Sequence, residues 1–266
     1  MNRIVVRTMA LAAALTLTAP AAARAQMPAA DIVKRSLGAF YAEGKDMQTR
    51  VSMSLVNAQG GERKRELTLL RKNMPAAGEQ RYYMYFHAPP DVKGTTFLVW
   101  KYPGKDDDRW IYIPAIKLVR RIAASDKRSS FVGSDFTYED VSGRDASDEN
   151  HTLLREENLG DRPCHVIESH PVASADYAKR VSWIDKERWL PLKEEYTDSR
   201  GRMTRVFTAD KVEQVAGHWT VTQRTMKNLT AGQHTIVLFQ NVVYDQGLAD
   251  NIFTERALRE PPASVR

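Results

Sequence analysis

Apolar side chains recur at every second position along most of this chain, and this alternation is the feature that most constrains its fold. Val51, Met53 and Leu55, for example, alternate with polar residues. A period of two places alternate side chains on opposite faces of a β-strand. The alternation, with turn residues between, predicts strands over 50–55, 64–71, 81–87, 95–102, 110–113, 116–122, 152–156, 164–169, 177–184, 192–198, 203–215, 219–227 and 235–243.

The segment before these strands has a different period. Val33, Leu37, Phe40 and Tyr41 lie at positions i, i+4, i+7 and i+8, which places them on one face of a helix. We therefore expect one N-terminal helix, followed by an antiparallel meander that curls into a barrel or a sandwich. The sequence contains no linker, fixed repeat or low-complexity tract, and so predicts a single domain.

Several of the expected strands are apolar or aromatic on both faces. The clearest are 82–86, 96–100 and 110–113. A sheet with one face in water alternates more cleanly, so either protein covers both faces of these strands or the sheet curves around something. Because only one helix is evident, covering both faces with protein is difficult. The pattern therefore favours a cavity or groove lined by the sheet.

The first 25 residues have the layout of a secretory signal peptide. Arg3 and Arg7 precede an apolar stretch over 8–19, and a small-x-small site follows, which predicts cleavage after Ala25. The apolar stretch is too short to span a bilayer. No cysteine lies near the cleavage site. We therefore expect a soluble protein that is exported to the periplasm and is not anchored by lipid.

The expected mature chain, residues 26–266, carries only a small positive charge. Loss of Arg3, Arg7 and Arg24 lowers the net charge from +6 to +3, which is an ordinary soluble surface and predicts no nucleic-acid partner. The single cysteine, Cys164, excludes an intramolecular disulfide and is predicted to be a small core residue.

Motifs for catalysis and for metal binding are missing from the sequence. Its six histidines are scattered and show no ligand spacing. The Gly-Ser-Asp run at 133–135 lacks the second glycine of a nucleophile elbow. The three aspartates at 106–108 could bind a cation, but such a run more often forms a solvated hairpin turn. We therefore expect no enzymatic activity, no metal site and no cofactor.

Several short motifs are more specific than the composition. They are FHAPPDVKGTTFL at 86–98, WIYIPA at 110–115, RRI at 120–122, FVGSDFTYED at 131–140, WID at 183–185 and LPL at 190–192. Together they resemble the bacterial outer membrane lipoprotein-sorting proteins, which are relatives of the LolA and LolB lipoprotein carriers. The resemblance extends over about residues 27–258 and is most specific in GSDFTYED at 133–140.

The resemblance implies a mostly β fold, an incomplete antiparallel barrel with an N-terminal helix and short lid helices over its open, apolar side. It also implies a function, because carriers of this type hold the acyl chains of lipids or lipoproteins while these cross the periplasm. An inner-membrane exporter of the resistance-nodulation-division class is the donor that the resemblance suggests.

A curved apolar sheet could hold an acyl chain without any chemistry. Exposing about sixteen carbons to water costs on the order of 10 kcal/mol, and a small barrel holds one ligand of that size. The residues predicted to line the groove are Met84, Phe86, Phe97, Val99, Ile111, Ile113, Val181 and Trp183. Since alternation does not say which face is concave, the same residues could instead form the core.

The segment with the most specific motif has two interpretations. Its key residues are Phe131, Gly133, Asp135, Phe136 and Tyr138. In the first, Gly133 makes a turn, Ser134 or Asp135 caps a short helix, and the aromatic rings anchor the segment. In the second, the segment is a lid that moves when cargo enters. Arg120 and Arg121 are expected to pair with its acidic residues, or with a lipid phosphate.

The sequence thus predicts a monomeric periplasmic carrier that moves lipid or acylated lipoprotein towards the outer membrane. One alternative is a periplasmic sensor of lipid or lipoprotein, for which 26–266 leaves no room for a second interaction domain. The other is an accessory subunit of a resistance-nodulation-division exporter, which would hold no extractable lipid.

Overall fold

The computed structural model describes residues 26–173 and 175–265, so the expected signal peptide over 1–25 lies outside the described residues. Thirteen strands in the described chain form one sheet in the order β6-β5-β4-β3-β2-β1-β13-β12-β11-β10-β9-β8-β7. The strands are β1 (Asp46–Val56), β2 (Glu62–Asn73), β3 (Gln80–Ala88), β4 (Thr96–Lys101), β5 (Asp108–Ile113), β6 (Leu118–Ile122), β7 (Glu149–Leu159), β8 (Arg162–Pro171), β9 (Lys179–Asp185), β10 (Pro191–Thr197), β11 (Met203–Val215), β12 (His218–Asn228) and β13 (Gln233–Tyr244). Each overlaps a strand that the alternation predicts.

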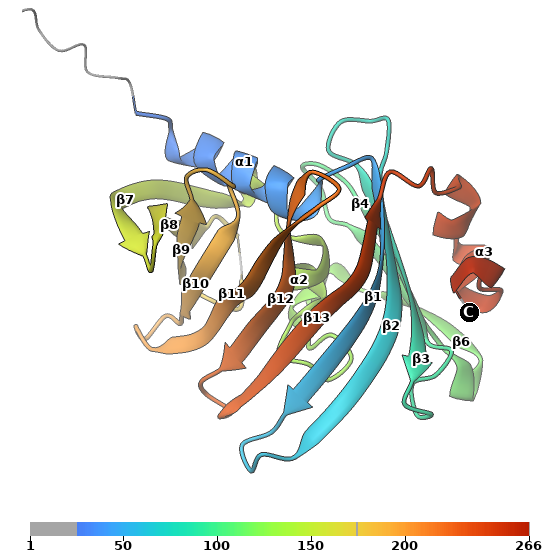
Figure 1. Cartoon of the computed structure of the whole chain (residues 1–266). Helices are drawn as coiled ribbons and strands as arrows, with labels where there is room; N and C mark the ends of the chain where they lie inside the picture. Colours follow the sequence, from blue (N-terminus) through green and yellow to red (C-terminus); the bar gives the residue numbers. More distant parts are fainter. Residues whose placement is uncertain (1–25, 174, 266) are drawn as a thin grey trace, which may run out of the picture.

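The chain enters the sheet in its middle and leaves it there. β1 pairs with β2 on one side and with β13 on the other. From β1 the chain runs outward to the edge strand β6, crosses to the opposite edge at β7, and returns strand by strand to β13. The sheet curls but does not close, since β6 and β7 are its two edges (Figure 1). The predicted fold class, an incomplete antiparallel barrel with few helices, is confirmed.

The connection from β6 to β7 lies on the concave side of the sheet. We call residues 123–148 the plug; it contains the short helix α2 (Tyr138–Ser142), which lies inside the concavity (Figure 1). A capping box starts α2: the Thr137 hydroxyl accepts from the Asp140 N–H, and the Asp140 carboxylate accepts from the Thr137 N–H. The prediction that Ser134 or Asp135 caps this helix is wrong, because the Asp135 side chain binds β13 instead.

The N-terminal helix α1 (Ala29–Tyr41) crosses one end of the concave side (Figure 1). Ile32 and Val33 are buried against Ile167 on β8 and Ile184 on β9. Phe40, the next-to-last residue of the helix, packs against the core of the half-barrel. The predicted N-terminal helix and its apolar stripe are therefore present, and the stripe faces the sheet.

The largest core cluster lies on the concave face, where apolar side chains of neighbouring strands are in register. Leu69, Met84, Phe97 and Ile111 oppose one another across β2, β3, β4 and β5, and all four are buried. Full burial of a large apolar side chain stabilises a fold by about 1.5–3 kcal/mol. This row therefore holds the first half of the sheet together from its inner side.

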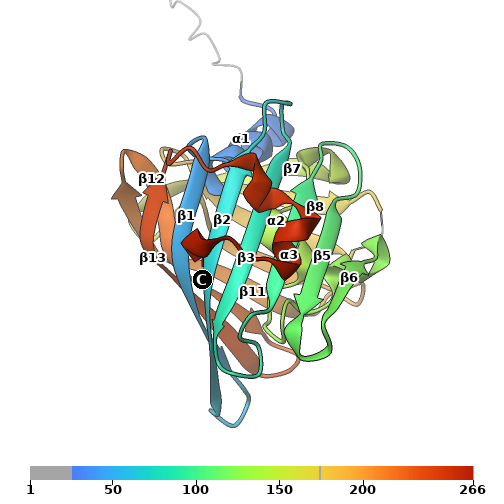
Figure 2. The same cartoon turned by 90° about the vertical axis from the view of Figure 1, so that its right-hand side faces the viewer.

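The convex face of the same strands is covered by the C-terminal segment. Phe253 and Leu258, the latter on α3 (Glu255–Arg259), pack against Tyr83 and its neighbours on the outer side of the sheet (Figure 2). The Tyr83 hydroxyl donates to the carbonyl of Ala257 at 2.7 Å. Protein thus covers both faces of β3–β5. The apolar side chains on both faces of these strands had instead favoured a cavity lined by the sheet. Residues 250–265 gave no sequence signal for this cover, because their helical turns are too short to show a period.

Candidate functional site

An empty space remains between the concave face of the sheet and the plug. It is partly open to solvent, and its volume of about 420 Å³ includes that open solvent. Its lining residues are Val51, Met53, Leu67, Leu69, Met84, Phe131, Phe136, Asp140, Val141, Arg224, Val237 and Phe239. We call this space the apolar groove, since only Asp140 and Arg224 in its lining are charged.

The eight residues predicted to line a groove fall into two groups. Six lie on the concave side, in or against its core cluster: Met84, Phe86, Phe97, Val99, Ile111 and Ile113. Of these, Met84 borders the empty space directly. Val181 and Trp183 instead pack with Cys164 on the opposite face of the sheet, because Ser182 and Ile184 take the inward positions of β9. The structure therefore does not bring these two residues together with the other six.

Most residues that line the apolar groove come from strands that the sequence interpretation did not connect with it. Val51 and Met53 belong to β1, Leu67 and Leu69 to β2, and Val237 to β13. The alternation of side chains predicted these strands from the sequence. Which alternating set faces the concavity depends on the pairing of β1 with β13, which are almost 200 positions apart and share no local pattern.

Aromatic side chains of the plug fill the part of the concavity beside the groove. The ring of Phe131 lies 5.3 Å from that of Phe97 and 5.6 Å from that of Tyr138, and Tyr138 lies 5.4 Å from Phe97. Phe136 is also buried in the same cluster. Edge-to-face contacts of this kind add stability beyond burial alone. The predicted aromatic anchors are therefore in contact with the sheet.

Polar contacts fix the plug at two further points. The Asp135 carboxylate accepts from the Thr235 hydroxyl at 2.7 Å and from the Gln233 amide at 2.9 Å, both on β13. Asp140 pairs with Arg205 on β11 at 2.9 Å. Gly133, with a φ of +79°, makes the turn that precedes them. The anchored interpretation of this segment describes the structure, and its movement as a lid stays a prediction.

Arg120 and Arg121 do not pair with the plug, and that expectation is wrong. The register of β5 and β6 places Arg121 opposite Trp110, two residues from Asp108, and Arg121 pairs with Asp108. Arg120 is exposed at the edge of the sheet. The acidic residues of the plug have other partners: Asp140 pairs with Arg205 on β11, and Asp135 accepts from Thr235 on β13.

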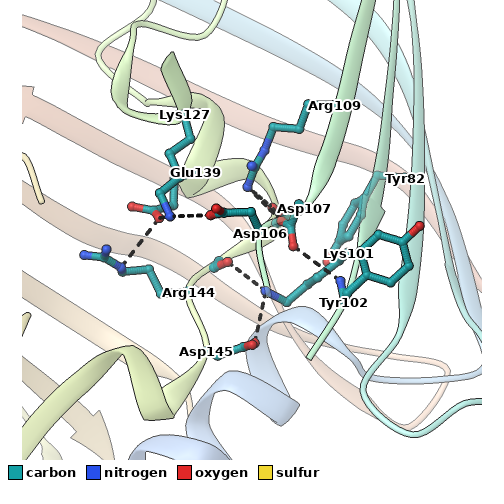
Figure 3. A network of polar contacts seen from close by, with 12 residues as sticks. Tyr82, Lys101, Tyr102, Asp106, Asp107, Arg109, Lys127, Glu139, Arg144 and Asp145 are labelled. Atoms are coloured by element: carbon teal, nitrogen blue, oxygen red, sulfur yellow. Dashed lines mark hydrogen bonds and ion pairs between the residues drawn. The ribbon is translucent and has the colours of Figure 1, made fainter. Parts of the chain in front are cut away.

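A polar network joins the far end of the plug to the β4–β5 hairpin (Figure 3). Asp107 pairs with Arg109 at 2.7 Å and accepts from the Ser142 hydroxyl at 2.9 Å. The Lys101 ammonium donates to the Gly143 carbonyl at 2.9 Å and pairs with Asp145 at 3.3 Å. These contacts hold the residues after α2 against the rim of the sheet.

Lys127 extends this network across the plug (Figure 3). It lies 3.1 Å from Asp106 and 3.4 Å from Glu139, and Glu139 also pairs with Arg144 at 3.6 Å. Burial raises the pKa of Glu139 despite these two cations. Each carboxylate of the run at 106–108 therefore has a basic partner, which gives the run a structural role in a hairpin turn.

Opposite the apolar groove, the inner face of β7 and β9–β11 is charged. We call Glu149, Arg180, Glu194, Arg205 and Asp176 the charged wall. Arg180 pairs with both glutamates, and Arg205 with Asp176 at 2.7 Å. Burial alone would lower the pKa of Arg180, but the two carboxylates raise it well above its ordinary value. The alternation did not reveal this wall, because sequence reasoning places charged side chains on the outer face of a strand.

A second cavity lies between the charged wall, α1 and the plug. Its volume is about 770 Å³, and it too is partly open to solvent. Tyr177 and Tyr196 line it, and their hydroxyls donate to Glu149 at 2.5 Å and to Glu194 at 2.6 Å. In the described part of the chain, no three acidic, histidine or cysteine side chains converge as metal ligands would. No described helix has the length and apolar character needed to cross a bilayer.

The open antiparallel half-barrel with few helices is the fold of the LolA-like proteins. An outer membrane lipoprotein-sorting protein domain from Vibrio parahaemolyticus matches with a TM-score of 0.80 and 28% identity, over 87% of this chain and 98% of that one. A LolA superfamily protein from Nitrosomonas europaea has the same fold, with a TM-score of 0.67 and 19% identity, over 86% of this chain and 98% of that one. The resemblance identified from the motifs is confirmed.

Within this class, the chain belongs to the DUF1329 family. A DUF1329 family protein from Desulfovibrio piger matches with a TM-score of 0.81 and 31% identity, over 86% of this chain and 97% of that one. The profile of a family described only as "uncharacterized protein" matches residues 78–260. No curated protein matches the chain.

Proposed function

We propose that this chain is a periplasmic carrier that binds the acyl chains of lipids or lipoproteins in the apolar groove and moves them towards the outer membrane. The observation that carries the proposal is the apolar groove itself, a space between apolar strands and a plug that is partly open to solvent.

The free energy of burying an acyl chain supports this function. Each methylene removed from water stabilises the bound state by about 0.8 kcal/mol, so about sixteen carbons supply on the order of 10 kcal/mol. Val51, Met53 and Leu67 on the wall of the groove offer apolar contact along its length. Reversible burial of this kind needs no covalent step, so the proposal assigns no catalytic residue.

The plug is the proposed lid of the groove. Phe131 and Phe136 both line the groove and fill part of the concavity, so their withdrawal would enlarge the space available to cargo. The plug is joined to both edge strands of the half-barrel, and its polar anchors are separate from its aromatic ones. A segment with these properties can open while the sheet stays folded.

The experiment that tests the carrier is native mass spectrometry of the protein purified from periplasm, followed by lipid extraction. Bound lipid or acyl species at close to one per chain is the expected result. Uptake of a fluorescent fatty acid by the delipidated protein provides a second measurement. A protein that emerges bare and also takes up no probe would overturn the proposal and favour the sensor or the exporter subunit.

A matched pair of variants connects the result to the groove. Val237 is buried and lines the groove, whereas its neighbour Leu238 is 37% exposed on the other face of β13. Val237→Trp should fill the groove and reduce bound lipid at least about tenfold, since overpacked sites tolerate little further volume. Leu238→Trp should leave retention unchanged. Thermal unfolding of both proteins shows whether either change acts through stability.

Compartment and partner complete the proposal. The periplasmic location depends on the signal peptide over 1–25, and N-terminal sequencing of the exported protein should begin at Gln26. We propose that the cargo comes from an inner-membrane exporter of the resistance-nodulation-division class, the donor that the family resemblance suggests, and that the exporter binds the carrier transiently. The carrier itself is proposed to be a single-domain monomer. Crosslinking in membranes should recover such an exporter, and size-exclusion chromatography with light scattering should give one chain.

A further inference from the structure

Arg224, in the middle of β12, lies where three cavities meet. It lines the apolar groove, the cavity of about 770 Å³ beneath α1, and a third cavity of about 620 Å³ that α1, β12 and β13 share. Its guanidinium carbon is 4.8 Å from the ring centre of Phe239, 5.2 Å from that of Phe136 and 5.5 Å from that of Phe40. A positive charge therefore lies among three phenylalanine rings inside the concavity.

No residue that the structure describes forms a hydrogen bond or an ion pair with this guanidinium, and its Nε is buried without a partner. The inward-facing arginines of the charged wall differ in their ion pairs, although the Nε of Arg180 is also buried without a partner. Arg180 and Arg205 each pair with two carboxylates. Asp140, which also lines the groove, is already engaged by Arg205 and by the Thr137 N–H.

The surroundings of Arg224 explain how the charge is tolerated without a counter-ion. Burial lowers its pKa, and Tyr41, Asp140 and Tyr82 oppose that effect. The faces of aromatic rings attract a cation, and the adjoining cavities leave room on the remaining sides. A guanidinium in such a place retains its five hydrogen-bond donors for a planar oxyanion, which it can bind through two parallel hydrogen bonds.

We propose that Arg224 is the head-group site of the groove, and that the preferred cargo is a single acyl chain carrying an oxyanion, a carboxylate or a phosphate, bound with the anion inward. This inference rests on the proposed function and narrows its cargo. Val237 lies opposite Arg224 in the register of β12 and β13, so the apolar wall begins beside the guanidinium. The tail would follow that wall towards Met53 and Leu67.

The same charge disfavours cargo with a neutral head. The acyl chains of a lipoprotein are joined to it through esters and an amide, whose carbonyl oxygens can accept single hydrogen bonds but carry no charge and form no ion pair with a guanidinium. A neutral chain that entered the groove would leave Arg224 without a partner and would remove the water available to it. Arg224 therefore distinguishes an anionic amphiphile from an acylated protein.

The test compares three ligands that have the same sixteen-carbon chain. Hexadecanoate, hexadecyl phosphate and hexadecanol are each used to displace the neutral probe N-phenylnaphthylamine from the delipidated protein. We expect at least one of the two anions to bind about tenfold or more tightly than the alcohol. The stronger of the two identifies the carboxylate or the phosphate as the natural head. Equal binding of all three ligands would overturn the inference and leave the carrier intact.

Variants of Arg224 assign the preference to this residue. Arg224→Met should bind hexadecanol at least as well as the natural protein and lose the preference for the anion. Arg224→Lys should retain part of it, since an ammonium keeps the charge but not the planar fork. Lys227→Met, which removes an exposed charge from the same strand, should change nothing. An anion preference that survives in Arg224→Met would place the head-group site elsewhere.

A stability measurement separates this role from a structural one. If Arg224 mainly holds the three rings together, Arg224→Met should lower the melting temperature. If it is an unsatisfied charge that awaits a ligand, the melting temperature of the ligand-free protein should stay the same or rise. Hexadecanoate should then raise the melting temperature of the natural protein but not that of the variant. Failure of every ligand to displace the probe would instead count against the carrier itself.

Discussion

In both halves of the concave surface, every second side chain of a strand points inward, yet the inward side chains of the two halves differ in chemistry. The inner faces of β1–β5 and β13 present mostly apolar side chains around the groove, although Arg71 and Arg109 on the same faces are charged and buried. The inner faces of β7 and β9–β11 present arginines and carboxylates, each satisfied by its opposite. The plug lies between the two and is fixed to both. A buried charge needs a partner, whereas an apolar wall needs none, so the two halves offer a ligand different surroundings.

The difference also indicates what each half is for. The charged wall is closed upon itself: Arg180 is held between Glu149 and Glu194, and both tyrosines beside it donate to these carboxylates. Such a network specifies one arrangement of β7–β11. The apolar half makes fewer demands on geometry, since its contacts are not directional. We infer that the charged half is the scaffold and the apolar half is the binding surface.

Breaking the charged wall should have the largest effect. Arg180→Met leaves Glu149 and Glu194 buried without a counter-charge, and should cost about 3–5 kcal/mol of unfolding free energy. Urea unfolding followed by circular dichroism measures this loss. Arg155→Met, which removes an exposed arginine that pairs with Glu157, should lower the free energy of unfolding far less, because solvent screens the pair. Similar losses in the two variants would mean that the wall is not a scaffold.

Releasing the plug should have an intermediate effect. Thr235→Val removes the hydroxyl that donates to the buried Asp135 carboxylate, and should cost about 1–3 kcal/mol. If the plug is a lid, the loss is local, and hydrogen exchange should accelerate over 131–142 while β1 and β2 stay protected. Thr152→Val, at an exposed position of β7, is the matched control. Uniform acceleration across the sheet would show that the plug belongs to the global fold.

The smallest effect concerns Glu139, which pairs with Lys127 and Arg144 within the plug. Since burial raises its folded-state pKa above the unfolded value, the ionised form is disfavoured in the folded protein. The stability of the natural protein relative to Glu139→Gln should therefore rise as the pH falls from 7 through that pKa. Melting temperatures at a series of pH values measure the difference. An opposite slope would mean that the two cations outweigh burial; Glu62→Gln, at an exposed site, should show no trend.

Much of the fold was visible in local patterns. Every strand from β1 to β13 overlaps a segment of alternating residues, and the helix α1 follows from a single apolar stripe. The plug was identified by its motif, including Phe131, Phe136 and Tyr138 as its aromatic anchors. These features depend on residues close together in the chain, where the period of two or 3.6 positions acts directly.

The errors have a common physical origin in long-range pairing. Val181 and Trp183 were assigned to the groove, but the register of β9 with its neighbours points them to the other face. The cover over the convex face comes from residues 250–265, which meet β3 through contacts such as Tyr83 with Ala257. No local pattern contains these relations, because they join positions far apart in sequence.

By itself, then, the sequence determined the number, order and period of the strands, the N-terminal helix and the family resemblance. Each of these follows from neighbours within a few positions. The tertiary structure decided which face of each strand is concave, that one half of that face is apolar and the other charged, and that Arg224 lies unpaired between them. The reason is physical: curling of the sheet brings distant strands together, and only their shared environment decides whether a charge is satisfied.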